Sequence, residues 1–256
     1  MNSAVYTLKI CFHEKYHVLN LSTEERKLLE VSSEYLTVNS TKNTVLLKDD
    51  FFCQSKAVLD KWRYNLSYRN SSWALNSPQG SNVSEFKKGE SDELINPEMR
   101  NILFILESPH KDEFTENYAP LSPAAGKTGC NFQTYFVGFV LPILKNLGAN
   151  FNKSKSYSIC FVNPVPYQTS LFQAHKGKML PSLRDKVWKA IYPQCSEDFS
   201  DRVKSYKPHM IINSCTSQLK NELSKTLEAL DIPIFETSHP AAWAIAFGAF
   251  RAQTPV

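Results

Sequence analysis

The sequence predicts an α/β fold: a three-layer α/β/α domain with a central, mostly parallel four-stranded sheet, preceded by an N-terminal accessory region. Three observations support this fold class. Four short apolar runs follow residue 100, helical segments separate them, and polar residues of chemical interest come directly after each run. Strands that alternate with helices are typical of a parallel sheet covered on both faces.

The first part of the chain predicts a strand, two helices and a loop. Residues 5–12 are β-prone, with apolar side chains at Val5, Leu8, Ile10 and Phe12. Residues 21–25 offer a helix cap before an amphipathic segment, and residues 51–68 have apolar side chains at a spacing typical of a helix. Between residues 76 and 92 the composition shifts to Asn, Ser, Pro, Gly and Lys, which indicates an exposed loop. We therefore expect an accessory region and linker over residues 1–95 and the α/β domain over residues 96–256.

The second part of the chain predicts the sheet and its helices. The four strand candidates are 102–106, 157–162, 210–213 and 232–235, and the helix candidates between and after them are 131–147, 183–191 and 217–230. Open parallel sheets place their sites beyond the carboxyl ends of the strands. The residues in those positions are Glu107-Ser108-Pro109-His110, Asn163-Pro164-Val165-Pro166-Tyr167, Ser214-Cys215-Thr216 and Ser238-His239-Pro240.

Composition narrows the function classes. Residues 111–190 hold ten basic and four acidic side chains, whereas the chain as a whole has a net charge of only +4. This local excess suits a nucleic-acid backbone, with an ordinary solvated face as the alternative. No apolar run is long enough to cross a membrane and the first residues do not resemble a signal peptide, so we expect a cytoplasmic protein without a membrane partner. The six cysteines form no Cys-x-x-Cys pair, and we expect neither a metal nor another cofactor.

The strand-end residues combine into a set suited to a nucleobase. Glu107 supplies a carboxylate, His239 an imidazole and Asn163 an amide, which can donate and accept hydrogen bonds at once. Residues 126–129, Gly-Lys-Thr-Gly, form a basic loop. Rings that can stack on a base are supplied by Phe132, Tyr167 and Trp243.

These residues resemble the uracil-DNA glycosylase superfamily over roughly residues 100–251, and most closely its thermostable iron-sulfur branch. Glu107-Ser108-Pro109 is similar to the first motif, which is Gly-Glu-Ala-Pro-Gly in that branch. Residues 123–129 resemble its Pro-Phe-Val-Gly-Arg-Ala-Gly loop, Asn163 matches the asparagine that reads the pyrimidine edge, and His239-Pro240-Ala241-Ala242 matches the second catalytic motif.

The resemblance implies hydrolysis of an N-glycosidic bond in DNA after the nucleotide flips out of the helix. It gives Glu107 the role of positioning or deprotonating water and His239 the role of stabilising the departing base. Asn163, Phe132, His110 and Ala124 would surround the base. Lys127, Ser238 and Trp243 would contact DNA, with Trp243 in the place of a leucine wedge. A helix-capping carboxylate, a satisfied histidine and a core tryptophan are the alternatives for Glu107, His239 and Trp243.

The sequence also departs from the family pattern. Ser108 stands where the uracil-specific enzymes have a water-activating aspartate, so Glu107, or Asp112 or Glu113 nearby, would have to activate water. Ala124 replaces a stacking aromatic, which suggests a base larger than uracil, such as a modified cytosine of phage DNA attacked in antiviral defence. Uracil repair and a non-catalytic DNA- or protein-binding module are the alternatives. No cysteine spacing matches the branch's cluster, and the sequence leaves the oligomeric state open.

One competing motif is His13-Glu14-Lys15-Tyr16-His17, which satisfies the His-Glu-x-x-His pattern of zinc peptidases. That chemistry needs both imidazoles on one face of a helix and a third ligand. Because residues 5–12 predict a strand, we do not expect a zinc site here.

Overall fold

A computed structural model describes residues 5–31, 33–76 and 99–246 of the chain. It divides into two compact units, each assembled from separate stretches of sequence. The first unit contains residues 1–58, 108–121 and 165–196, and the second contains residues 59–107, 122–164 and 197–256.

The first unit contains a four-stranded sheet in the order β2-β1-β4-β3. β1 pairs antiparallel with β2 and parallel with β4, and β3 pairs antiparallel with β4. The predicted first strand is therefore confirmed. So is the predicted helix start, because Ser22 caps α1 in a capping box with Glu25. The elements are β1 (Tyr6–Phe12), β2 (Lys15–Leu21), α1 (Thr23–Leu29), β3 (Leu36–Asn39), β4 (Thr44–Leu47), and the short α4 (Phe172–His175).

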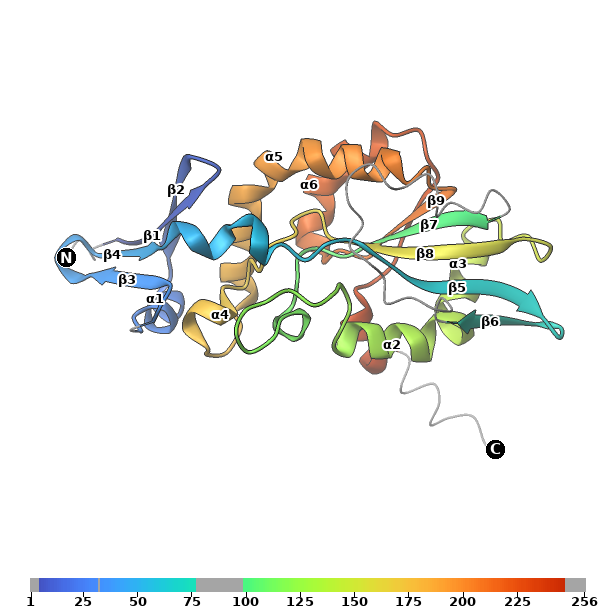
Figure 1. Cartoon of the computed structure of the whole chain (residues 1–256), viewed down its shortest axis with the longest axis horizontal. Coiled ribbons are helices and arrows are strands. Elements are labelled where there is room, and N and C mark those ends of the chain that lie inside the picture. The colour runs from blue at the N-terminus through green and yellow to red at the C-terminus, as the bar shows by residue number, and fades with distance from the viewer. Residues whose placement is uncertain (1–4, 32, 77–98, 247–256) are drawn as a thin grey trace. The chain divides into compact units, whose positions relative to one another are not determined.

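The second unit is built on a six-stranded sheet in the order β10-β9-β7-β8-β5-β6 (Figure 1). β10, β9, β7 and β8 pair in parallel, whereas β5 pairs antiparallel with both β8 and β6. The sequence predicts four strands, so the strand number is wrong by two. The strands are β5 (Lys61–Arg69), β6 (Ser72–Asn76), β7 (Met99–Ile105), β8 (Ser156–Val162), β9 (Met210–Asn213) and β10 (Ile234–Glu236).

The two additional strands come from residues for which the sequence predicts a helix and an accessory region. The helix predicted over residues 51–68 is wrong, because residues 61–69 form β5. Tyr64 and Leu66 are buried in that strand, and alternation of buried side chains along it fits the two-residue period of a sheet. The predicted boundary near residue 95 and most of the predicted loop lie outside the described residues, whereas residues 61–76 belong to the sheet of the second unit.

Helices lie on both sides of this sheet (Figure 1). On one side, α2, α3 and the π-helical turn between them bury Phe132, Leu144 and Phe136 against the strands, and on the other α6 buries Leu219 and Leu223. These helices confirm the predicted segments at 131–147 and 217–230, and α5 extends the segment predicted at 183–191. Their bounds are α2 (Lys127–Tyr135), a π-helical turn (Phe136–Val140), α3 (Leu141–Asn146), α5 (Pro181–Ser205), which passes from the first unit's residues into the second's, and α6 (Ser217–Glu228).

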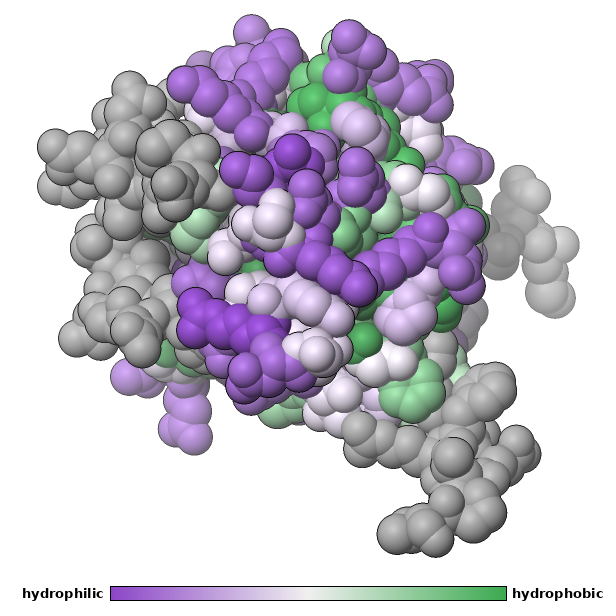
Figure 2. All heavy atoms as spheres, turned by 90° about the vertical axis from the view of Figure 1, so that its right-hand side faces the viewer, coloured by the Kyte–Doolittle hydropathy of each residue, from purple (hydrophilic) through white to green (hydrophobic). Residues whose placement is uncertain are grey.

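The space-filling view (Figure 2) shows one of the two ends of the parallel strands. Figure 2 looks at the end of the second unit where β8 begins, and hydrophilic side chains predominate there among smaller apolar areas. The opposite end, where the parallel strands finish, carries the residues singled out from the sequence.

Among the described residues, no helix has the length and apolar character needed to cross a membrane.

Candidate functional site

The carboxyl ends of the four parallel strands meet at one edge of the sheet. Ile105 of β7 pairs with Val162 of β8 and with Asn213 of β9, and Asn213 pairs with Glu236 of β10. Glu107, Asn163, Thr216 and His239 follow within a few residues of these positions, and all four belong to the second unit. The predicted strand-end residues of this unit therefore share an edge, as expected for a parallel sheet.

Asn163 is the most unusual residue of this edge. It is fully buried, and neither its side-chain oxygen nor its side-chain nitrogen has a hydrogen-bond partner among the described residues. Most buried polar side chains do have a partner, because an unpaired amide in a dry environment costs free energy. An amide held in this state is able to donate to and accept from a ligand that presents both kinds of group.

The backbone of Asn163 is held by a buried ion pair. Arg202 of α5 donates from Nη2 to the carbonyl oxygen of Asn163 at 3.0 Å and from Nη1 to Asp60. Tyr206 donates its hydroxyl to the same Asp60 oxygen at 2.9 Å, and Arg202 Nε donates to Asp198 at 2.8 Å. Burial lowers the pKa of Arg202, but the charges and hydrogen bonds of Asp60 and Asp198 together raise it by more, so the guanidinium stays charged. This network fixes the strand end that presents the amide.

Glu107 is buried and bound to the start of α6. Its Oε2 accepts hydrogen bonds from the Thr216 hydroxyl at 2.9 Å and from the Thr216 backbone nitrogen at 3.3 Å. Thr216 is the N-cap residue of α6. The capping role that the sequence left open for Glu107 is therefore present, and it fixes one carboxylate oxygen at the edge of the sheet.

His239 sits in a turn that α2 anchors. Its Nδ1 accepts a hydrogen bond from the backbone nitrogen of Ala241 at 3.2 Å, so in the neutral imidazole the proton resides on Nε2. Asn131 of α2 donates from Nδ2 to the Pro240 carbonyl at 2.9 Å, and Trp243 Nε1 donates to the Ser238 carbonyl at 2.8 Å. The turn thus presents a preset tautomer in which Nε2 is a hydrogen-bond donor.

Three residues expected at the base or the DNA lie in the core instead. Phe132 is fully buried, with ring centroids 4.5 Å from Phe136 and 5.2 Å from Tyr64, both in stacked geometry. Trp243 is fully buried 5.8 Å from Phe132, so it is a core residue and not an exposed wedge. Ala124 is also fully buried. The stacking and wedge roles are therefore wrong for this conformation, because the apolar core between α2 and the sheet holds these side chains.

The loop that contains Ala124 depends on a glycine. Ala124 has a φ of +56°, and a Cβ on Gly129 would lie 2.0 Å from the Ala124 carbonyl oxygen. Only glycine fits such a close backbone approach. Arg63 of β5 also fixes this loop, donating from Nη1 to the Ser122 hydroxyl at 3.0 Å and to the Pro123 carbonyl at 3.3 Å.

The remaining predicted residues are placed as follows. Lys127 is exposed at the first position of α2, and Ser238 is exposed beside His239. His110 belongs to the first unit, where its Nδ1 lies 3.2 Å from an Asp112 oxygen. Burial lowers the pKa of His110, Asp112 raises it and Lys111 lowers it further. Lys186, one of the basic residues of the 111–190 segment, pairs with Glu25 at 2.7 Å.

The zinc-peptidase motif does not lie on a helix. His13 and Glu14 form the turn between β1 and β2, with φ values of 45° and 64°. His17 lies on β2 and its Nε2 contacts Gln194 Oε1 at 2.8 Å. Within the described ranges, no group of three or more His, Cys, Asp or Glu side chains is arranged to hold a metal ion.

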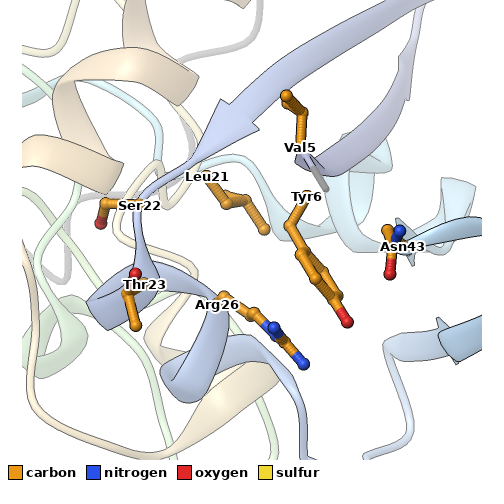
Figure 3. A pocket seen from close by; sticks show the side chains of 7 residues that line it. All are labelled: Val5, Tyr6, Leu21, Ser22, Thr23, Arg26 and Asn43. Carbon is orange, nitrogen blue, oxygen red and sulfur yellow. The ribbon is translucent and has the colours of Figure 1, made fainter. Parts of the chain in front are cut away.

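The first unit has a separate concavity of about 540 Å³. Figure 3 shows its lining, in which the guanidinium of Arg26 lies 3.4 Å from the centroid of the Tyr6 ring. Arg26 Nε also pairs with Glu30 at 2.7 Å. The lining residues are Val5, Tyr6, Leu21, Ser22, Thr23, Arg26 and Asn43.

Sequence reasoning missed the residues that support the site. Asp60, Arg202 and Asn131 act through contacts at sequence separations of 39 to 142 residues, which no local motif reveals. Thr216 carried a signal, since it follows a predicted strand and precedes a predicted helix, the usual position of an N-cap.

The chain was also compared with known proteins. No protein-family model matches it, and no curated protein matches it either.

Proposed function

We propose that this protein is a DNA glycosylase that hydrolyses the N-glycosidic bond of a flipped-out pyrimidine nucleotide. The observation that carries the proposal is the fully buried amide of Asn163, which has no hydrogen-bond partner among the described residues and lies at the sheet edge it shares with Glu107 and His239. A pyrimidine presents a donor or acceptor at position 4 beside N3, and one amide can satisfy both. The motif resemblance described above supports the same family and the same fold.

In this proposal His239 and Glu107 carry out the reaction. The bond between C1′ and the base nitrogen breaks with its electron pair passing to the base, which leaves an oxocarbenium-like sugar and an anionic base. The Nε2–H of His239 donates a hydrogen bond to the base oxygen that gains this charge. Water adds to C1′, and Glu107 accepts the proton that water loses, while its negative charge favours the positive sugar. The products are a free base and an abasic site.

Access to Asn163 requires a change in conformation. Because the amide has no exposed surface, a base reaches it only when the side chains above it move. A bound base then forms hydrogen bonds with the oxygen and the nitrogen of the amide. These two hydrogen bonds stabilise the bound conformation relative to the unbound one. The proposed substrate is a 5-modified cytosine of phage DNA, attacked in the cytoplasm as a defence, with uracil as the competing base.

The test is a substrate screen. Purified protein is incubated with duplex and single-stranded DNA containing uracil or enlarged 5-modified cytosines, and alkali-labile abasic sites are measured. We expect base release from at least one substrate, and His239→Ala and Glu107→Ala should each slow it at least tenfold. His209→Ala is the matched control, since His209 precedes β9 at the opposite edge of the sheet, and it should retain the rate. Full activity of both site variants would remove these residues from the mechanism.

A non-catalytic DNA-binding module is the second candidate. It is favoured by the burial of Phe132 and Trp243, which leaves the base and the duplex without the expected stacking and wedge groups. In this case the protein would bind DNA and produce no abasic sites on any of the substrates. The same screen therefore separates the two functions.

A further inference from the structure

Two cations begin the strand that the sequence did not predict. Lys61 and Arg63 lie at the start of β5, which runs antiparallel to β8 (Figure 1). Lys61 pairs with Phe161, two residues before Asn163. Residues paired across a sheet are neighbours, and Phe161 is the last residue but one of β8. Lys61 therefore lies at the sheet edge of the candidate site.

Arg63 links this strand to the loop on the same side. Its guanidinium donates to the Ser122 hydroxyl and the Pro123 carbonyl, both of which are neutral acceptors. That loop leads to Lys127, the exposed first residue of α2. Lys61, Arg63 and Lys127 therefore come from two segments joined by these hydrogen bonds.

None of these three cations forms an ion pair with a carboxylate in the part of the chain that the structure describes. Other partly buried cations of the second unit do: Arg202 pairs with Asp60 and Asp198, and Lys220 pairs with Glu236 at 3.2 Å. A charge removed from water is costly unless an opposite charge accompanies it. Lys61 and Arg63 are both half-buried, so part of this cost falls on them without an anion from any described residue.

The titration of Lys61 agrees with this geometry. Burial lowers the pKa of Lys61, and the nearby charge of Arg63 lowers it further. Both effects would be relieved by an anion bound between or beside the two side chains.

We propose that Lys61 and Arg63 form a phosphate site for the DNA backbone beside the candidate site at the Asn163 end of the sheet. The proposal rests on the proposed function, because a nucleotide whose base occupies the Asn163 edge carries phosphates on both sides of its sugar. A phosphodiester supplies the negative charge that no described residue brings to these two side chains, and guanidinium and ammonium groups are its usual protein contacts. Lys127 would contact the same strand from the loop.

The test measures binding without relying on catalysis. Labelled oligonucleotides carrying a tetrahydrofuran abasic analogue, which has no base to release, are titrated with protein at several salt concentrations. Lys61→Met should weaken binding about tenfold at about 0.1 M salt and reduce the salt slope by about one phosphate contact. Lys153→Met is the matched control. It removes the same charge, and Lys153 precedes β8 at the other end of the sheet. It should change binding by less than Lys61→Met.

A second measurement locates the contact. Single phosphates near the analogue are replaced one at a time by neutral methylphosphonates. One replacement should weaken binding of the wild type and leave binding of Lys61→Met unchanged. Arg63→Lys keeps the charge, so it should lose less affinity than Arg63→Met, whose folding is checked by thermal denaturation because Arg63 also holds the loop.

The outcomes separate this proposal from the enzymatic one. Equal losses in Lys61→Met and Lys153→Met, or binding of inorganic phosphate and mononucleotides but not of oligonucleotides, would overturn the backbone site. Lys61-dependent binding without base release on any substrate would leave the phosphate site standing and remove the glycosylase. Base release together with DNA binding that does not depend on Lys61 would support the glycosylase and overturn the phosphate site.

Discussion

Replacing Asn163, whose side-chain amide has no hydrogen-bond partner among the described residues, should raise the free energy of unfolding and abolish base release. In Asn163→Leu, a side chain of similar shape without polar atoms occupies the same buried position. A buried amide that lacks partners costs about 1–3 kcal/mol in mutational data, and the substitution removes this cost. We therefore expect the free energy of unfolding to rise by about 1–3 kcal/mol, which corresponds to about 2–4 °C in Tm for each kcal/mol in a chain of this size.

A second buried asparagine, Asn101, does have a hydrogen-bond partner and serves as the comparison. Asn101 is also buried, but its Nδ2 donates to the Tyr206 carbonyl at 2.8 Å. Asn101→Leu would leave that carbonyl without its partner and should destabilise the protein by about 1–3 kcal/mol. Thermal and urea denaturation of the wild type and both variants give the comparison directly.

The reasoning fails if Asn163→Leu is destabilised to the same extent as Asn101→Leu. That result would mean that the Asn163 amide forms hydrogen bonds in the unbound protein and is not available to bind a ligand. The glycosylase proposal adds a second requirement, namely that the more stable Asn163→Leu variant releases no base from the substrate that the wild type uses.

Three further predictions concern the framework of both units. Gly129→Ala should destabilise the protein by about 1–3 kcal/mol because its Cβ would lie 2.0 Å from a backbone oxygen, whereas Gly138→Ala, with nothing within 4 Å, should be neutral or stabilising in urea denaturation. Arg202→Met should cost about 3–5 kcal/mol because it strands the buried charge of Asp60, and adding Asp60→Asn should recover part of the loss in a double-mutant cycle. Burial lowers the pKa of His175, and its hydrogen bond to a backbone carbonyl raises it by less, so the folded state disfavours the protonated imidazole. His175 should therefore contribute stability that is present above its unfolded pKa of about 6.5 and is lost as the pH falls through the lower folded value, and His175→Gln should flatten this slope when Tm is measured against pH. An unchanged slope in that variant would assign the acid sensitivity to other groups.

The parallel strands and their end residues were predictable because they depend on local patterns. A run of apolar residues between turn signals indicates a buried strand whatever its neighbours are, and the carboxyl edge then follows from topology. The strand at residues 61–69 was not predictable in this way. Its apolar residues also fit a helical spacing, and the choice depends on β8, which lies some ninety residues later in the chain. The burial of Phe132 and Trp243 was hidden for the same reason, since a ring in a motif carries no sign of whether its faces meet a base or the core.

The interleaving of the two units has a practical consequence. The backbone passes between them five times, at residues 58/59, 107/108, 121/122, 164/165 and 196/197. Cutting at any single point therefore cannot release either one intact. A chain starting at residue 96 would keep 108–121 and 165–196 yet lose the strands of their own unit, and would strip β5 from the flank of β8. Such a truncation would expose apolar surface on both remnants, so mapping by alanine substitution in the intact chain is the sounder route to dissecting this molecule.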